Sequence, residues 1–239
     1  MPIARPGRQT TLLVMRIPAD AALLPQSQKL RDKMVKRDLV GRDIADARVL
    51  AAMRQVPREL FVPPAFARRA YDDCALPIAE GQTISQPYIV ALMAEQAQLT
   101  AASAVLDIGT GSGYAAAVFS LLAGRVLTIE RHAPLAAAAA ALLSQLDIRN
   151  VSVRTGDGTL GWPEAAPFDA VLAAASAAEI PSAWTDQLAV GGRLILPVGH
   201  VDGFQELVQL TRAEDGRLVR RSLGPVMFVP LIPGSRESS

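Results

Sequence analysis

The stretch Ala104-Val105-Leu106-Asp107-Ile108-Gly109-Thr110-Gly111-Ser112-Gly113-Tyr114 determines how the rest of the chain is interpreted. Its short apolar run predicts a buried parallel strand, the glycines end that strand, and residues 115–123 are typical of a helix. The glycines allow positive φ and let main chain lie against a ligand with no Cβ between them, at the positive end of the next helix. The stretch therefore predicts a strand, tight turn and helix that bind a nucleotide-like cofactor.

The glycine turn alone does not identify the cofactor, because NAD, FAD and S-adenosylmethionine enzymes and purely structural turns all contain it. The dinucleotide fingerprint has Gly or Ala in its sixth position, where this chain has Tyr114. An acid just before the turn would repel a pyrophosphate but suits a cationic sulfonium and its amino-acid tail. The charge pattern favours S-adenosylmethionine, and the expected cofactor-binding residues here are Asp107, Gly109, Thr110, Gly111, Ser112 and Gly113.

Two further acids follow predicted strands. Glu130 ends the apolar run 125–129, roughly twenty residues after the glycines, where such folds place a carboxylate that accepts from ribose hydroxyls. Asp157 and Gly158 follow the run 151–154, where the carboxylate can face an adenine amino group. The alternative is that both acids merely cap strand ends. Because carboxyl ends of parallel strands meet at one crevice, we expect Glu130, Asp157 and Gly158 to join the cofactor site.

Composition excludes several classes of function. The chain has 239 residues, a net charge of +1 and half its residues hydrophobic, which suits one well-cored domain with an appendage, or at most two. No basic surface for nucleic acid is expected. A single cysteine and two histidines are too few for a metal site of these ligands, so no metal is expected. No stretch approaches a membrane span or a signal-peptide core, which predicts a cytoplasmic protein with no membrane partner.

The order of predicted elements indicates the fold class. Residues 1–26 are expected to be a loosely ordered extension, and residues 27–239 a single domain. Within it, residues 27–100 form a helical substrate or cap region, and residues 101–239 carry the cofactor-binding sheet and C-terminal strands. Strands alternate with helices along this part, including an expected helix at residues 181–188 and a strand at residues 193–198. Residues 204–211 and 218–223, joined by a turn at Asp215-Gly216, read as a hairpin. This order predicts an α/β fold, a doubly wound, mostly parallel sheet with an antiparallel edge hairpin and an N-terminal helical region.

A polar loop precedes the cofactor-binding unit. Pro87 suits the first turn of a helix, so Ser85 or Gln86 lies at the N-cap. A hydroxyl and free amides at a helix N-terminus form a site for an anion. The alternative is that Ser85 only caps the helix. Its clustering with Gln82, Thr83 and Gln86 favours a functional role.

Segments along most of the chain resemble the protein-L-isoaspartate (D-aspartate) O-methyltransferase family. The resemblance covers about residues 29–231, and the segment Gln82–Pro87 is specific to that family, whereas the glycine turn is shared by methyltransferases at large. Three residues depart from the family pattern: Ala79, Ala174 and Met227. The matching segments are, in order, Val56-Pro57-Arg58-Glu59-Leu60-Phe61-Val62-Pro63, Ala70-Tyr71-Asp72-Asp73, Leu76-Pro77-Ile78, Gly81-Gln82-Thr83-Ile84-Ser85-Gln86-Pro87-Tyr88, the glycine turn, Gly156-Asp157-Gly158, residues 191–199 and Phe228-Val229-Pro230-Leu231.

The resemblance implies a Rossmann-like class I methyltransferase that repairs aged proteins. It would transfer methyl from S-adenosylmethionine, leaving S-adenosylhomocysteine, to the free α-carboxylate of L-isoaspartyl residues in proteins and peptides, and so start repair through a succinimide. Ser85 matches the family's active-site serine and would hold that carboxylate. The resemblance also implies substrate contacts for Thr83, Ile84, Gln86, Val229 and Pro230, and a monomer is expected. The alternatives are a non-catalytic relative that binds S-adenosylmethionine or peptide, and an NAD-dependent oxidoreductase on the same fold.

Overall fold

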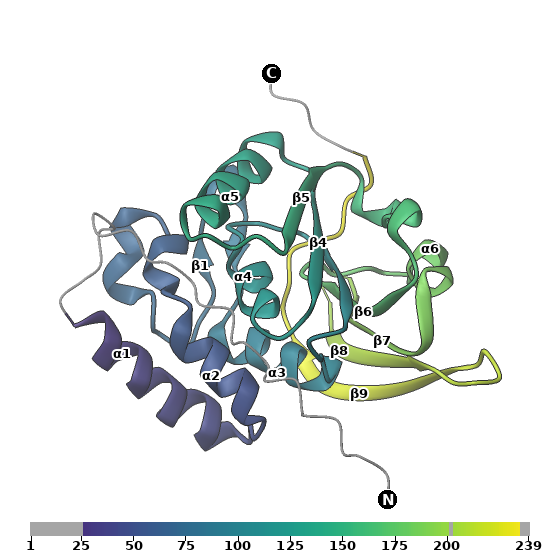
Figure 1. The fold of residues 1–239 in the computed structure, drawn as a ribbon, viewed down its shortest axis with the longest axis horizontal. Helices are drawn as coiled ribbons and strands as arrows, with labels where there is room; N and C mark the ends of the chain where they lie inside the picture. Colours follow the sequence, from purple (N-terminus) through teal and green to yellow (C-terminus); the bar gives the residue numbers. More distant parts are fainter. Residues whose placement is uncertain (1–25, 201–202, 235–239) are drawn as a thin grey trace, which may run out of the picture.

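The computed structural model describes residues 26–200 and 203–234, so the expectation for residues 1–26 lies outside the described residues except for Gln26. One sheet has the strand order β5-β4-β3-β6-β7-β8-β9 (Figure 1). The first five of these strands run parallel, and β8 and β9 each run antiparallel to the preceding strand. This confirms the predicted fold class. The strands are β3 (Ala104–Ile108), β4 (Arg125–Glu130), β5 (Val151–Thr155), β6 (Phe168–Ala173), β7 (Leu188–Gly199), β8 (Gln205–Arg212) and β9 (Leu218–Val226).

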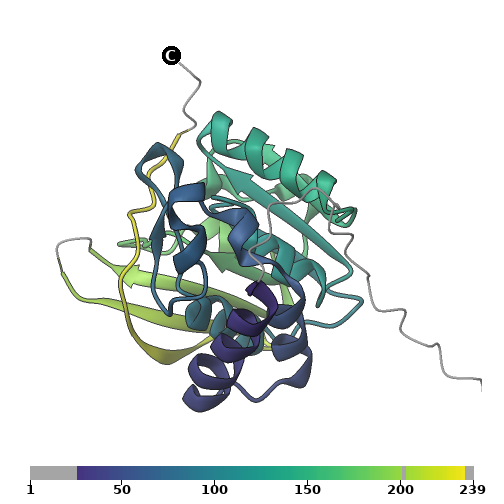
Figure 2. The same ribbon diagram turned by 90° about the vertical axis from the view of Figure 1, so that its left-hand side faces the viewer.

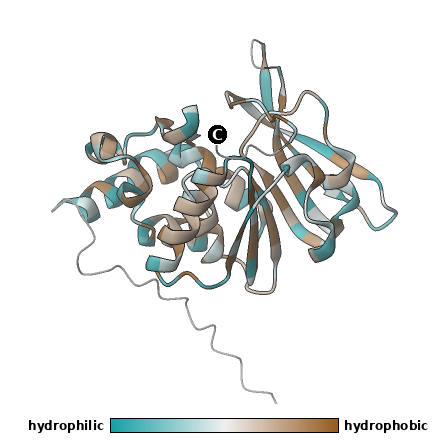
Figure 3. Ribbon diagram, turned by 90° about the horizontal axis from the view of Figure 1, so that it is seen from above, coloured by the Kyte–Doolittle hydropathy of each residue, from teal (hydrophilic) through white to brown (hydrophobic). Residues whose placement is uncertain are grey.

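The central strands are apolar on both faces and separate two hydrophobic cores. Val105 packs into the core under the helices α2 (Ala47–Gln55), α3 (Pro87–Ala97) and α4 (Tyr114–Ser120), whereas its neighbour Leu106 packs into the other core. That second core contains Trp184 of α6 (Ser182–Asp186). Successive side chains of a strand point to opposite faces, so burial on both faces explains the unbroken apolar runs in the sequence. Figure 3 shows apolar residues concentrated in these strands.

Three element boundaries differ from the expected ones. The helix after the glycine turn ends at Ser120 instead of residue 123. The strand expected at residues 193–198 already begins at Leu188, because Leu188 pairs with Phe168 before an irregularity in the register. The preceding helix is correspondingly shorter than the expected residues 181–188. Both changes near Gly191 follow from sheet pairing, which local propensity does not contain.

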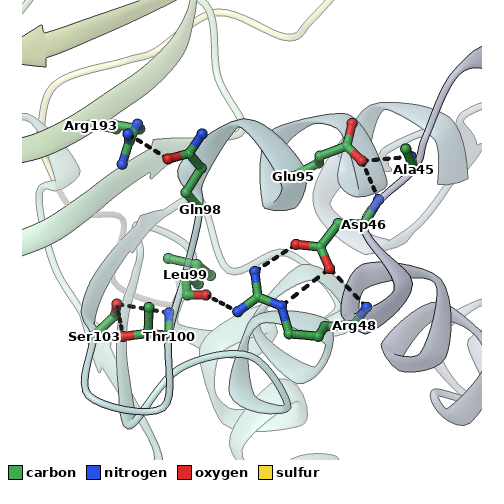
Figure 4. A network of polar contacts seen from close by, with 9 residues as sticks. All are labelled: Ala45, Asp46, Arg48, Glu95, Gln98, Leu99, Thr100, Ser103 and Arg193. Carbon is green, nitrogen blue, oxygen red and sulfur yellow. Dashed lines mark hydrogen bonds and ion pairs between the residues drawn. The ribbon is translucent and has the colours of Figure 1, made fainter.

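The helical region begins with α1 (Ser27–Met34), which continues as π- and 3-10-helical turns to Arg42. Asp46 caps α2, because its carboxylate accepts a hydrogen bond of 2.8 Å from the backbone N–H of Arg48. Figure 4 shows how this end of α2 is held to α3 and the sheet. Glu95 of α3 accepts from the N–H of Asp46 at 2.6 Å, and Arg193 of β7 donates to Gln98 just after α3 at 2.6 Å. The region is therefore tied by polar contacts to the sheet it covers.

The remaining helix of the sheet, α5 (Ala133–Gln145), connects β4 to β5. The chain reverses its direction of winding between the neighbouring strands β3 and β6, and such a switch point is where open α/β sheets bind ligands, beyond the carboxyl ends of the strands. A small hairpin, β1 (Leu76–Pro77) and β2 (Thr83–Ile84), precedes α3. Among the residues that the structure describes, no helix has the length and apolar character needed to cross a membrane.

The C-terminal segment, residues 227–234, crosses this carboxyl edge after β9 (Figures 1 and 2). Ser176, which follows β6, donates its N–H to Val229 and accepts from the N–H of Leu231, both at 2.8 Å. Further on, the N–H of Gly234 donates to Asp157 at 2.7 Å. These bonds fix the segment across the carboxyl ends of the strands.

Candidate functional site

Two hollows meet at this edge of the sheet. The first, here called the sheet-end cavity, has about 590 Å³ of space, part of it open to solvent. Its walls come from the β1–β2 hairpin, the glycine turn, the ends of β3, β4 and β6, and the C-terminal segment: Gln82, Thr83, Ile108, Gly109, Gly111, Ile129, Glu130, Arg131, His132, Gly158, Ala174, Ala175, Val229, Pro230, Leu231 and Ile232.

The second hollow, here called the side groove, opens beside the first. It lies between the start of α3, the end of β9 and the C-terminal segment, and Ser85 is on its wall. Thr83, Val229 and Pro230 line both hollows, so the groove and the cavity adjoin at these residues. The further lining residues of the groove are Arg42, Asp73, Cys74, Ala75, Gln86, Tyr88, Ile89, Leu92, Leu223, Gly224, Pro225, Val226, Met227 and Phe228.

The glycine turn has the expected backbone, but its N–H groups are bonded to acceptors within the protein. Gly109 and Gly111 have φ of 94° and 54°, values that favour glycine. The N–H groups of Gly109 and Thr110 donate to the carbonyl of Ile129, and the N–H of Gly111 donates to Glu130 at 2.9 Å. A pyrophosphate needs free amides at such a turn and would also face the Glu130 carboxylate. The turn therefore suits an electrically neutral or cationic ligand group better than a dinucleotide.

Gly113 has a different use from the one predicted. Its φ is 88°, and a Cβ at this position would lie 3.3 Å from the Cβ of Ala139 on α5. The missing side chain allows α5 to pack against the turn, so the structure assigns Gly113 to packing. Thr110 is also buried, with its hydroxyl bonded to Thr128 at 2.7 Å, and neither Thr110 nor Ser112 lines the cavity.

Glu130 lies where the sequence predicted, at the end of β4 and in the cavity wall. Its side chain is buried, and its two carboxylate oxygens accept from the N–H groups of Gly111 at 2.9 Å and His132 at 3.0 Å. A carboxylate oxygen has two acceptor positions, so each oxygen can accept a second hydrogen bond from a ligand. The two backbone bonds hold the carboxylate in a fixed orientation at the cavity.

Asp107 does not reach the cavity, contrary to the expectation. It is the fourth residue of β3, only 2% exposed, and accepts a hydrogen bond of 2.8 Å from the hydroxyl of Thr128. The pKa of Asp107 is raised to about 7, mainly by burial. The hydrogen bond from Thr128 acts against this rise, and the nearby negative charge of Glu130 adds to it. The residue sits behind the turn and supports the hydroxyls of Thr128 and Thr110.

Asp157 is also turned away from the cavity, whereas the adjacent Gly158 lines it. The Asp157 carboxylate accepts from the N–H and hydroxyl of Thr159 and from the N–H of Gly234. Partial burial would raise the pKa of Asp157, but these hydrogen bonds outweigh it and lower the pKa. In this structure the carboxylate caps the short 3-10 turn Gly158–Leu160 and anchors the C-terminal segment.

Several cavity residues were not predicted from sequence. His132 is buried in the cavity wall, at the N-cap of α5, with its Nδ1 3.6 Å from a carboxylate oxygen of Glu80. Its position two residues after Glu130 was a usable signal. Leu231 and Ile232 enter the cavity because the C-terminal segment folds back across the sheet, a contact between distant parts of the chain that no local pattern contains.

Ser85 lies half-buried in the wall of the side groove. The N-cap of α3 is Gln86, and neither its side chain nor that of Ser85 forms a capping hydrogen bond. The alternative that Ser85 is merely a helix cap is therefore wrong. Its hydroxyl forms no hydrogen bond with the described residues, and the residue lines the groove together with Thr83, where groove and cavity adjoin.

Two of the predicted substrate contacts are engaged elsewhere. The side chain of Ile84 is 4% exposed and belongs to the core, because β2 alternates between an outward Thr83 and an inward Ile84. The side-chain N–H groups of Gln86 donate hydrogen bonds to the carboxylate and to the carbonyl oxygen of Asp73, at 2.7 and 3.0 Å. A side-chain amide has two N–H donors, so Gln86 has none left for an anionic substrate.

The three departures from the family pattern lie around the two hollows. Ala174 is in the cavity wall, with its Cβ 3.5 Å from where a Cβ on Gly109 would lie. Ala79 starts the turn of the β1–β2 hairpin, and Glu80 next to it has a φ of 58°. Met227 is 91% exposed at the groove.

The doubly wound sheet, the acid at the end of its second strand and the internally bonded glycine turn together define a Rossmann-like methyltransferase that uses S-adenosylmethionine. The model of the protein-L-isoaspartate(D-aspartate) O-methyltransferase (PCMT) family matches residues 28–236. The chain belongs to this family.

Relatives and solved structures agree with this assignment. The chain is 54% identical over 203 residues to protein-L-isoaspartate O-methyltransferase 2 of Marinobacter nauticus, covering 85% of this chain and 93% of the relative. It is 52% identical over 217 residues to the protein-L-isoaspartate O-methyltransferase of Methylorubrum extorquens, covering 91% and 94%. A Plasmodium falciparum structure described as a protein-L-isoaspartate O-methyltransferase in complex with S-adenosyl-L-homocysteine matches with a TM-score of 0.72 and 26% identity, over 86% of this chain and 98% of that chain.

Proposed function

We propose that this chain transfers methyl from S-adenosylmethionine to the α-carboxylate of L-isoaspartyl residues in aged proteins and peptides. The observation that carries the proposal is the junction of the two hollows at Thr83, Val229 and Pro230. A cofactor in the cavity and a peptide in the groove would meet there, and membership of the family supports these ligands.

The cavity residues fit S-adenosylmethionine. Glu130 would accept from the ribose hydroxyls through the free acceptor positions of its oriented carboxylate. Ile108, Ile129 and Gly158 offer apolar surface and room for a flat ring. When bound, the cofactor supplies a methyl group activated by the sulfonium. Among the predicted binding acids, only Glu130 keeps this role in our proposal, because Asp107 and Asp157 are turned away.

The peptide carboxylate needs placement more than acid–base help. Its reference pKa of about 3.9 means that it is ionised at neutral pH, so no general base is required. Ser85 would donate its hydroxyl to one carboxylate oxygen and hold the other toward the methyl group. Thr83, Val229 and Pro230 would surround the reacting groups and exclude water, which favours a reaction in which the anion loses charge.

The proposed function assigns a role to each of the two regions of the chain. In our proposal, residues 27–239 are one methyltransferase domain, in which residues 27–100 supply the substrate side and residues 101–239 the cofactor side. The hydrophobic core under α2, α3 and α4 contains residues from both regions, which supports a single domain. The substrates are isoaspartyl-containing proteins and peptides, the enzyme acts as a monomer, and nucleic acid is not a partner.

A peptide pair tests the proposed function. With radiolabelled S-adenosylmethionine, an isoaspartyl peptide should accept label and the aspartyl peptide of the same sequence should not. In the isoaspartyl residue the peptide bond is formed by the side-chain carboxyl group, and only this form has a free α-carboxylate. Binding of S-adenosylhomocysteine without labelling of either peptide would instead support the non-catalytic alternative.

Replacing Glu130 with alanine should weaken S-adenosylhomocysteine binding by about 1–3 kcal/mol, the range for losing hydrogen bonds to a charged acceptor. The loss includes the bonds that orient the N–H groups of Gly111 and His132. Titration calorimetry measures the effect, and Glu164→Ala, at an exposed acid away from the cavity, is the control. An unchanged affinity for Glu130→Ala would remove this residue from the cofactor site.

A further inference from the structure

Asp73 connects three residues at the wall of the side groove. Its Oδ2 accepts from the Gln86 amide and from the Arg42 guanidinium, each at 2.7 Å. Its Oδ1 faces the N–H of Tyr88 in the first turn of α3 at 3.4 Å, and its carbonyl oxygen accepts from Gln86 at 3.0 Å. The carboxylate thus fastens the segment before β1 to the start of α3, immediately after Ser85.

Arg42 completes this arrangement from the helical region. Its guanidinium lies 3.7 Å from the centre of the Tyr88 ring while it pairs with Asp73. Stacking on one group and pairing with another fixes a long side chain more firmly than a surface ion pair alone. The Asp73 side chain is only 17% exposed, and Gln86, Arg42 and Tyr88 provide hydrogen-bond donors to its carboxylate.

The charge of this arrangement matters because the groove is proposed to receive an anion. Asp73 and Ser85 line the same groove, and an unpaired carboxylate there would repel the carboxylate of the substrate. Arg42 offsets the charge of Asp73 without occupying Ser85. The pair thus leaves an uncharged hydroxyl as the donor in this part of the wall.

We infer that Asp73 is a positioning residue for methyl transfer: through Gln86 and the first turn of α3 it fixes the Ser85 hydroxyl, while Arg42 neutralises its charge toward the substrate. The inference rests on the proposed function and extends it, because it assigns to Asp73, Gln86 and Arg42 roles other than substrate contact. It also gives a reason for the two hydrogen bonds from the side-chain amide of Gln86 to Asp73.

Steady-state kinetics with an isoaspartyl peptide test the inference. Asp73→Ala should lower kcat by about 10- to 100-fold, the scale of a misplaced reacting group. Gln86→Met, which removes the amide at similar volume, should lower kcat in the same direction. In an Ser85→Ala background, Asp73→Ala should add almost no further loss, because its effect passes through the Ser85 hydroxyl. Affinity for S-adenosylhomocysteine, measured by calorimetry, should stay unchanged in all three variants.

Arg42 provides a second readout. Arg42→Ala should raise the KM for the peptide roughly tenfold by leaving Asp73 unpaired in the groove. The double variant Arg42→Ala/Asp73→Asn should recover the lower KM, since the repelling charge is gone. A merely structural role would make the double variant worse than either single one.

The matched control is Asp72→Ala, which removes the neighbouring acid, more than half exposed and paired with Arg69 at the surface. It should retain wild-type kcat. Equal kcat for Asp73→Ala and Asp72→Ala, additive losses with Ser85→Ala, or a parallel loss of S-adenosylhomocysteine affinity would each overturn the inference. A wild-type enzyme that labels no isoaspartyl peptide would contradict the proposed function, and the inference with it.

Discussion

Ser85→Ala should lower kcat for methyl transfer by about tenfold to a thousandfold, with S-adenosylhomocysteine affinity unchanged. The loss is expected because the hydroxyl is the donor that would fix the substrate carboxylate at the junction of groove and cavity. Stability should change little, since Gln86 is the N-cap of α3 and the Ser85 side chain does not cap it. Steady-state kinetics and thermal unfolding of the same preparation separate these effects.

Substitution with acidic and neutral residues at this position separates alignment from charge. Ser85→Asp should fold, bind S-adenosylmethionine and fail to methylate, because it places a negative charge against an anionic substrate. Ser85→Asn retains a donor and should keep more activity than the aspartate variant. Full activity of Ser85→Asp would show that the carboxylate binds elsewhere.

Asp107→Asn should change how stability depends on pH. In the folded protein the pKa of the Asp107 carboxyl is raised from 3.8 to about 7. Between these two pH values the folded protein retains a proton that the unfolded chain releases. The stability that the protonated group contributes is therefore present below about pH 4 and is lost as pH rises toward 7, at about 1.4 kcal/mol per unit of pKa shift. Asparagine does not titrate and removes this loss.

Denaturant unfolding of wild type and variant checks this prediction. At about pH 4.5 the two proteins should differ little, and at about pH 8 Asp107→Asn should be more stable by about 2–4 kcal/mol. Asp215→Asn is a control of opposite sign, because hydrogen bonds from Arg217 lower the pKa of Asp215 at the surface turn. If the Asp107→Asn difference stayed constant between the two pH values, the carboxyl would titrate normally and its burial would carry no electrostatic cost.

The strands of the sheet and the glycine turn could be predicted because short stretches of the sequence carry the residue patterns of buried strands and turns. The run from Ala104 to Ile108 is mostly apolar and is buried on both faces, as is usual for a central parallel strand, and the glycines that follow it take the left-handed backbone of the turn. Glu130 was placed in the same way, since the end of β4 must lie beside the end of β3 in a parallel sheet. The antiparallel end of the sheet followed from the turn at Asp215 and Gly216.

The detailed site was harder to predict because it depends on which way each side chain faces. An acid before a glycine turn can lie in the cavity or behind the turn, and the threonine on the neighbouring strand that binds Asp107 is not local in sequence. Gly113 resembles a ligand-binding glycine, yet the helix packed against it is twenty-six residues away at Ala139. The contact of Gln86 with Asp73 likewise joins two segments of the fold.

The cavity wall formed by the C-terminal segment is the largest feature that local patterns did not predict. Val229 and Pro230 were assigned to the site only by family resemblance, and Leu231 and Ile232 were not assigned to it. Their place depends on the backbone bonds between Ser176 and the segment after β9. Such pairing between distant residues emerges only when the whole sheet has formed.

The chemical nature of the product tests the proposed reaction most directly. After incubation with S-adenosylmethionine labelled in the methyl group and an isoaspartyl peptide, the peptide should be separated and exposed to mild base. A carboxyl ester predicts that the label leaves as volatile methanol, because base hydrolyses the ester or closes it to the succinimide. Label that stays on the peptide in base would show methylation of nitrogen or another stable position and would contradict carboxyl methylation.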